Sequence, residues 1–220
     1  MVNLDNHEIE NFISEIELEK IVKIMSKIPT RWKYKNTVGT SIGIGHPLRN
    51  WFDKLVFKKV QKIFGDKCKM LFSMYLDEDD PFKIHSDYFH KRIGEPFITF
   101  LIPLSVDNNK NKVHLAKSIV FDQIDTFVDN DIHTKKSYTH DFKKIYNKPL
   151  DNNASYLHET ELAHLDKNDL KLLSVKKVLP WTRGNAIYWE AKSLHCSNNY
   201  KQKGMTSKQA IVIHTYKGEE

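Results

Sequence analysis

The stretch that decides the fold is PFKIHSDYFH, Pro81–His90, in which a histidine and an aspartate stand two residues apart. It leaves an acidic turn, DEDDP, and its KIHSDYF portion reads as a short strand. Alternate side chains of a strand point to one face of the sheet, so His85 and Asp87 would enter the same cavity. An imidazole nitrogen and a carboxylate oxygen there could bind one divalent ion. Two polar residues on a surface strand would give the same sequence pattern. A metal site therefore needs a third ligand from elsewhere in the chain.

The candidate third ligand is His195, in IYWEAKSLHCSNN. It follows a predicted strand and is expected at a turn before the final strand. Two histidines and one carboxylate on one side of a metal leave the opposite positions open. This facial triad is the arrangement of non-haem Fe(II) oxygenases, in which a co-substrate and dioxygen must both reach the iron.

A bidentate 2-oxo acid would occupy two open positions, and its distal carboxylate would need a cation. Lys208 opens the last predicted strand, KQAIVIHTYK. Period-2 alternation places Lys208, Ala210, Val212 and His214 on one face. Lys208 could then hold the carboxylate by a charge-assisted hydrogen bond. His214 becomes a candidate for contact with the co-substrate, although a core histidine would show the same pattern.

Helical periodicity comes first along the chain, and strand periodicity follows it. Phe12–Ile28 predicts an amphipathic helix with Ser14 as N-cap, Glu17 closing a capping box and Pro29 stopping it. A second amphipathic helix starts at Arg49 and ends at Gly65. We expect these helices on the outside of a sheet. Predicted strands are Cys68–Leu76, Pro96–Val106, Ala116–Asp122, Leu172–Pro180, Gly184–Ala191 and Lys208–Lys217.

The overall composition is that of a globular domain. The 220 residues are 40% hydrophobic and 11% aromatic, which suffices for a core. We expect one domain, 1–220, with helical support over 1–66 and a β core over 68–216 that carries a polar insert at about 125–170. The acidic N-terminus and the short apolar runs predict a cytoplasmic protein. Two cysteines make neither a disulfide framework nor a zinc half-site.

The formal net charge of +6 permits an acidic partner such as a nucleic acid. Arginine is the better residue for bidentate recognition of bases or phosphates, however, and only four of the 34 basic residues are arginines. Nucleic-acid binding therefore stays open as the weaker explanation of the positive net charge.

The ordered set of motifs resembles the Fe(II)/2-oxoglutarate-dependent dioxygenases. The resemblance rests on IHSD, FITFLIPLS, SIVFDQ, RGNAIYWEAKSLHCS and KQAIVIHTY, and covers roughly Cys68–Tyr216. It implies a mainly β fold with bracing helices, around a double-stranded β-helix or jelly-roll core. It also implies that His85, Asp87 and His195 bind iron and that Lys208 anchors 2-oxoglutarate.

Two further positions resemble the prolyl-hydroxylase branch of that family. The resemblance implies that Tyr75, before the His-Asp pair, and Thr99, after it, lie near the co-substrate. Many members have arginine as the anchor, whereas this chain has lysine. The gap from His195 to Lys208 is also long, which leaves Lys201 and Lys203 as rival anchors.

The activity implied by the resemblance is hydroxylation, coupled to conversion of 2-oxoglutarate and dioxygen into succinate and carbon dioxide, with ascorbate as a supporting reductant. The Asp87 carboxylate favours hydroxylation over halogenation, because a halogenase needs that position for chloride. We expect a peptidyl side chain or a small amino-acid-like molecule as substrate, with a nucleobase as the alternative. The insert is expected to form a lid or wall over the mouth.

Two other classes remain open on sequence alone. One is a non-catalytic basic β-barrel binding module in which the triad is coincidental. The other is a nucleic-acid-binding protein, whose affinity would fall steeply with salt.

Overall fold

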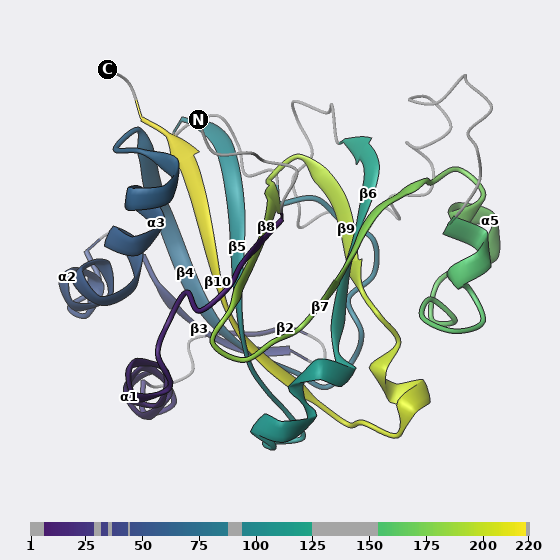
Figure 1. The fold of residues 1–220 in the computed structure, drawn as a ribbon, viewed down its shortest axis with the longest axis horizontal. Coiled ribbons are helices and arrows are strands. Elements are labelled where there is room, and N and C mark those ends of the chain that lie inside the picture. The colour runs from purple at the N-terminus through teal and green to yellow at the C-terminus, as the bar shows by residue number, and fades with distance from the viewer. Residues whose placement is uncertain are drawn as a thin grey trace.

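The computed structural model describes residues 7–28, 32–34, 37–43, 45–87, 94–124 and 154–218. Two antiparallel sheets face each other (Figure 1). The larger sheet has the strand order β1-β8-β5-β10-β4-β3-β2 and the smaller one β7-β6-β9. The strands are β1 (Glu8–Ile9), β2 (Trp32–Tyr34), β3 (Thr37–Ile42), β4 (Cys68–Glu78), β5 (Glu95–Val106), β6 (Lys117–Ile124), β7 (Val175–Pro180), β8 (Ala186–Glu190), β9 (Ser193–Ser197) and β10 (Lys208–Lys217).

The first helix, α1 (Glu15–Met25), begins as its sequence predicts. Ser14 is the N-cap, and the reciprocal hydrogen bonds between Ser14 and Glu17 form the predicted capping box. This arrangement satisfies backbone donors that a helix start leaves unpaired. The helix ends at Met25 with Ser26 as its C-cap, three residues before Pro29.

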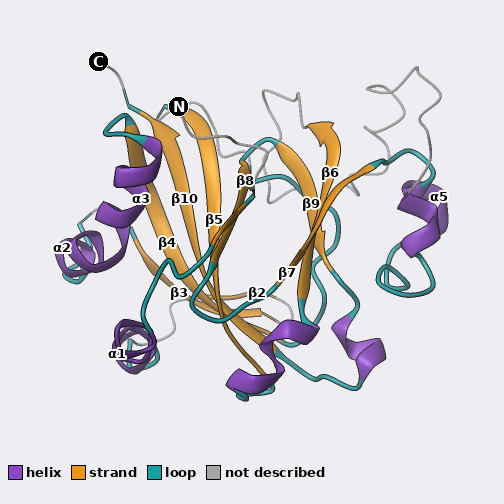
Figure 2. Cartoon of the chain, in the orientation of Figure 1, coloured by secondary structure: helices purple, strands orange, loops and turns teal. Residues whose placement is uncertain are grey.

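The second helical segment is continuous but changes its winding. It consists of α2 (Arg49–Phe52), a π-helical turn (Asp53–Phe57) and α3 (Lys58–Phe64). Gly65 ends it as predicted, at a φ of 84° that favours glycine. Figure 2 shows α1, α2 and α3 on the same side of the larger sheet. Their apolar stripes pack there against the outward side chains of the sheet, which include Ile98, Phe100, Ile102, Ile211 and Ile213.

Six of the predicted strands occur, with shifts of a few residues at their ends, whereas the predicted KIHSDYF strand does not form over its described residues. Four strands are additional. β1, β2 and β3 lie within the N-terminal part that was expected to be helical, and all three join the larger sheet. The fourth is β9, which carries His195 where a turn was expected. Among the described residues, no helix is long and apolar enough to cross a bilayer.

The space between the two sheets holds a second apolar cluster. Side chains of the smaller sheet meet the inner face of the larger one there, with Val120 and Leu179 opposite Leu101 and Val212. Two short 3-10 turns, Lys110–Leu115 and Tyr200–Lys203, lie at the strand connections. This inner face is where Lys208 and His214 were expected.

The described part of the insert covers the outside of the smaller sheet. It contains a 3-10 turn (Ala154–Leu157) and α5 (Lys167–Leu170), and Figure 1 places α5 on the far side of that sheet from α1. The prediction that the insert forms a lid or wall over the mouth is therefore wrong for these described residues, since they pack on the back of β6 and β9. Residues 125–153 lie outside the described part of the chain. The apolar side chains that the described part of the insert and the adjoining Leu173 bury in this cluster are Ala154, Leu157, Leu162, Leu165, Leu170 and Leu173.

Candidate metal centre

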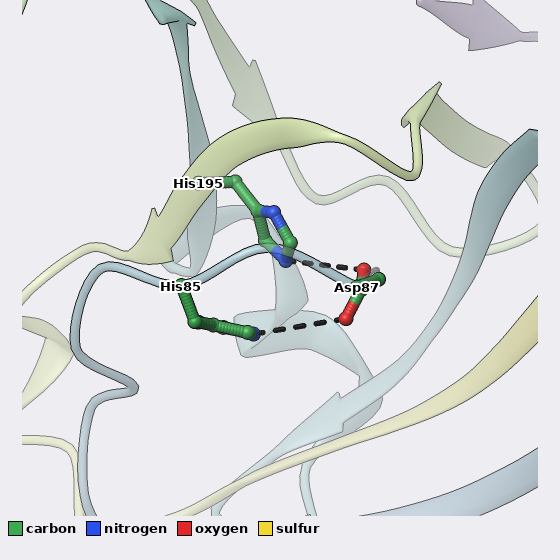
Figure 3. Close-up of side chains that lie close together, drawn as sticks. All are labelled: His85, Asp87 and His195. Atoms are coloured by element: carbon green, nitrogen blue, oxygen red, sulfur yellow. Dashed lines mark ion pairs between the residues drawn. The ribbon is translucent and has the colours of Figure 1, made fainter. Parts of the chain in front are cut away.

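The three predicted metal ligands lie together between the sheets. His195 Nε2 is 3.3 Å from Asp87 Oδ2, and His85 Nε2 is 3.9 Å from Asp87 Oδ1 (Figure 3). One potential ligand atom from each residue lies within 4.8 Å of the other two. The His85 and His195 rings are 4.2 Å apart between centroids. The sequence prediction of a convergent His-Asp-His cluster matches this geometry.

Backbone hydrogen bonds hold the two histidines side by side. His85 N donates to His195 O at 3.0 Å, and His195 N donates to His85 O at 2.9 Å. Asp87 N donates to Ala191 O at 2.9 Å. Over its described residues, the predicted KIHSDYF strand is reduced to one isolated β-bridge, between His85 and His195. The pairing with β9 therefore replaces an independent strand as the support of the ligands.

The outer nitrogen of each imidazole is already used. His85 Nδ1 lies 2.7 Å from the carbonyl oxygen of Lys83, and His195 Nδ1 lies 3.0 Å from that of Ser193. A carbonyl can only accept, so it favours the tautomer with the proton on Nδ1. Nε2 then carries the lone pair toward Asp87. This is how metal-binding histidines are usually oriented.

Electrostatics favour an ionised carboxylate at Asp87 and a neutral imidazole at His195. Burial would raise the pKa of Asp87, but the imidazoles of His195, His214 and His85 lower it to about 2. Thr99 also favours the ionised carboxyl, although its hydroxyl has no partner within normal hydrogen-bond distance among the described residues. Burial lowers the pKa of His195 to about 4, against the attraction of Asp87. These are the protonation states that metal ligands require.

The wall beside Asp87 comes from three neighbouring strands. Thr99 is paired in register with His214 on one side and Trp189 on the other, so the three share the inner face. Trp189 Nε1 donates to Asp87 Oδ2 at 3.3 Å. His214 is buried and contacts Phe72, with ring centroids 4.6 Å apart and the two rings tilted by 43°. Thr99 and His214 therefore lie beside the triad, and their contact with a co-substrate stays a prediction.

Of the three candidate anchors, Lys208 alone lies on the inner face. Its side chain is 3% exposed, and Nζ lies 4.4 Å from the centre of the Trp181 ring. Lys201 and Lys203 lie on the 3-10 turn before β10, where they pair with Asp80 and Glu161. The geometry favours Lys208 over its rivals.

Tyr75 is not in the site. It is paired in register with Ile211 and packs against the cluster under the helices. That cluster lies on the opposite face of the sheet from Lys208 and His214. The resemblance suggested Tyr75 from its place on the strand before the His-Asp pair, but the alternation of β4 turns it outward.

Three polar neighbours were not predicted for the site. Trp189 contacts Asp87, Ser197 Oγ accepts from Lys208 Nζ at 2.6 Å, and Glu78 lies 3.0 Å from Lys208 Nζ. Ser197 follows His195 by two, so strand alternation could have indicated it. Glu78 is the second residue of the acidic DEDD run, which resembles an exposed turn.

Comparison with known proteins gives a match through structure only. No family model matches the sequence, and no curated protein matches it. Solved structures do match. The non-haem alpha-ketoglutarate-dependent epimerase SnoN from nogalamycin biosynthesis is 9% identical with a TM-score of 0.58, over 97% of this chain and 82% of that one.

Two other matches come from named organisms. The viral collagen prolyl hydroxylase of Paramecium bursaria Chlorella virus-1, solved with 2-oxoglutarate, is 9% identical with a TM-score of 0.52, over 96% and 95% of the two chains. HygX of Streptomyces hygroscopicus, solved with nickel and 2-oxoglutarate, is 11% identical with a TM-score of 0.52, over 96% and 82%. The chain therefore has the double-stranded β-helix fold of the Fe(II)/2-oxoglutarate oxygenases, as the sequence predicted.

Proposed function

We propose that this chain is a non-haem Fe(II)- and 2-oxoglutarate-dependent oxygenase. The observation that carries the proposal is the convergence of His85, Asp87 and His195, with both Nδ1 atoms held by carbonyls. Two imidazoles and one carboxylate form the donor set of Fe(II) facial triads. The ligand atoms lie close enough together for one ion, and the fold is the one in which such sites occur.

The residues around the triad would each have a separate task. The Lys83 and Ser193 carbonyls keep the imidazole Nε2 atoms available to the metal. The Trp189 indole orients Asp87, and Lys208 would hold the distal carboxylate of 2-oxoglutarate. Once bound, the iron would supply activation of dioxygen coupled to oxidative decarboxylation of the 2-oxo acid. The protein supplies orientation and a buried surrounding.

The reaction that we propose is hydroxylation of a peptidyl side chain or a small amino-acid-like molecule. Asp87 supports it, because the carboxylate fills the position that halide would need. Thr99 beside the triad retains the likeness to the prolyl-hydroxylase branch, whereas Tyr75 no longer supports it. A nucleobase substrate is the alternative, and the net charge of +6 is what favours it.

Metal binding and co-substrate turnover test the proposal directly. The full chain is titrated anaerobically with Mn(II) and Fe(II) by calorimetry. The Fe(II) form is then given 2-oxoglutarate and air, and succinate is measured by NMR. We expect one metal per chain and slow succinate formation without substrate. His195→Ala should lose both, and the exposed His114→Ala is the control that should keep both.

The anchor is tested with a matched pair of lysines. Lys208→Met should weaken 2-oxoglutarate binding to the Mn(II) form while leaving Mn(II) affinity unchanged. Lys201→Met removes an exposed lysine from the preceding turn and should change neither. If Lys201→Met weakened the co-substrate instead, the anchor would be wrong.

The substrate is sought by a mass-spectrometric screen for products that gain one oxygen atom. The iron-loaded protein is incubated with 2-oxoglutarate, ascorbate and separate pools of amino acids, peptides and oligonucleotides. Oxidation confined to oligonucleotides, with binding that falls steeply as salt rises, would favour the nucleobase alternative.

A further inference from the structure

Glu78 lies next to Lys208, the candidate anchor, on the inner face of the larger sheet. It ends β4, Lys208 begins β10, and the two residues are paired in register. Their side chains are 4% and 3% exposed, and Glu78 Oε2 lies 3.0 Å from Lys208 Nζ. The carboxylate of the protein itself thus lies beside the ammonium that a co-substrate carboxylate would need.

The pair balances its own charge in a place shielded from water. Lys208 Nζ also donates to Ser197 Oγ at 2.6 Å, and the Trp181 ring covers one side of it. Burial raises the pKa of Glu78, and the attraction of Lys208 opposes that rise. A buried cation is stable only when paired, and here Glu78 supplies the pairing charge.

A second carboxylate at Lys208 would meet Glu78. Two carboxylates would then share one ammonium in a dry site, and like charges at contact distance disfavour such binding strongly. A 2-oxo acid with an uncharged tail would not meet this repulsion. The pair therefore discriminates between co-substrates by the charge at their distal end.

We propose that Glu78 is a specificity-determining residue that competes with the distal carboxylate of a 2-oxo acid for Lys208. The proposal rests on the proposed function, because it takes the triad and Lys208 as the co-substrate site. Wild-type protein should then bind 2-oxoglutarate no more than a few times more tightly than 2-oxopentanoate, which has the same chain length without the second carboxylate.

The test is calorimetry on the Mn(II)-loaded full chain with these two acids. Glu78→Gln keeps the shape of the side chain and frees Lys208, so it should tighten 2-oxoglutarate by about tenfold or more while 2-oxopentanoate changes by less than about threefold. Glu161→Gln is the matched control. Glu161 is also a buried carboxylate, but it pairs with Lys117 and Lys203 instead, so its loss should change neither affinity.

A double variant guards against failure of the single variant to fold. Glu78→Gln combined with Lys208→Met leaves no unpaired charge and should remove any preference for the second carboxylate. In wild type alone, 2-oxoglutarate binding about a hundredfold tighter than 2-oxopentanoate would overturn the proposal. So would a folded Glu78→Gln that binds 2-oxoglutarate no better. Absence of Mn(II) binding in wild type would overturn the proposed function itself, and this inference with it.

Discussion

The two faces of β10 are equally buried but have different roles. On the outer face, Ile211 and Ile213 are 0% exposed and pack under the helices. On the inner face, Lys208 and His214 are 2% and 3% exposed, and one lies beside Glu78 and the other near Asp87. The outer face of this strand thus packs in the core under the helices, whereas the inner face carries charged and titratable groups beside the apolar Ala210 and Val212.

The contrast separates the residues that stabilise the fold from those that carry the proposed chemistry. Apolar burial on the outer face stabilises the chain in proportion to the area removed from water. A buried ion pair such as Lys208–Glu78 contributes little net stability, because desolvation offsets the attraction between its charges. We therefore expect the outer face to determine folding and the inner face to determine chemistry.

The largest expected effect is loss of a metal ligand on the inner side. Asp87→Ala should reduce metal-dependent succinate formation to background, because the two imidazoles remain without the anionic ligand. The free energy of unfolding should fall by less than about 2 kcal/mol, since no apolar core is removed. Metal titration and urea denaturation of the same preparation measure both. Retained turnover would refute the triad.

The opposite pattern is expected on the outer face. Ile213→Ala should lower the free energy of unfolding by about 2–5 kcal/mol, because it leaves a cavity under the helices. Ile213→Val removes one methylene group and should cost about 0.5–1.5 kcal/mol. Turnover per folded molecule should stay unchanged in both. A selective loss of turnover at full stability would break the division between the faces.

A smaller effect is expected at the residue that orients Asp87. Trp189→Phe keeps an aromatic ring but removes the indole donor, so Mn(II) affinity should fall by about tenfold, as for other groups that orient metal ligands. Tyr188→Phe changes the neighbouring residue on the outer face and should leave Mn(II) affinity unchanged. Equal losses in the two variants would show general loosening of β8 instead of a contact with Asp87.

Local signals in the sequence were sufficient for much of this architecture. The capping box at Ser14, the stop at Gly65 and the long apolar strands each depend on neighbouring residues, and the structure confirms them. The inner position of Lys208 follows from simple alternation within one strand. The convergence of His85 with His195 was suggested by the order of motifs along the chain.

The sequence predictions failed where hydrogen-bonded pairing between distant segments determines the structure. β9 is short, and it becomes a strand by pairing with β6, far away in the sequence. Glu78 was missed because its acidic surroundings resemble a turn, although it is the last residue of β4. Tyr75 was misplaced because lying on the strand before the His-Asp pair does not fix which face of the sheet a residue occupies, whereas its pairing with Ile211 does.

The smallest expected effect tests that register directly. Tyr75→Phe removes a hydroxyl from the helix-facing side, so the affinity of the Mn(II) form for 2-oxoglutarate should stay within about twofold of wild type. Thr99→Val is the inner-face counterpart: it removes a hydroxyl that is buried beside Asp87, and it should weaken metal or co-substrate binding measurably. Calorimetry on both variants compares the two faces at the scale of a single oxygen atom. If Tyr75→Phe weakened 2-oxoglutarate and Thr99→Val did not, the faces of the larger sheet would be assigned the wrong way round.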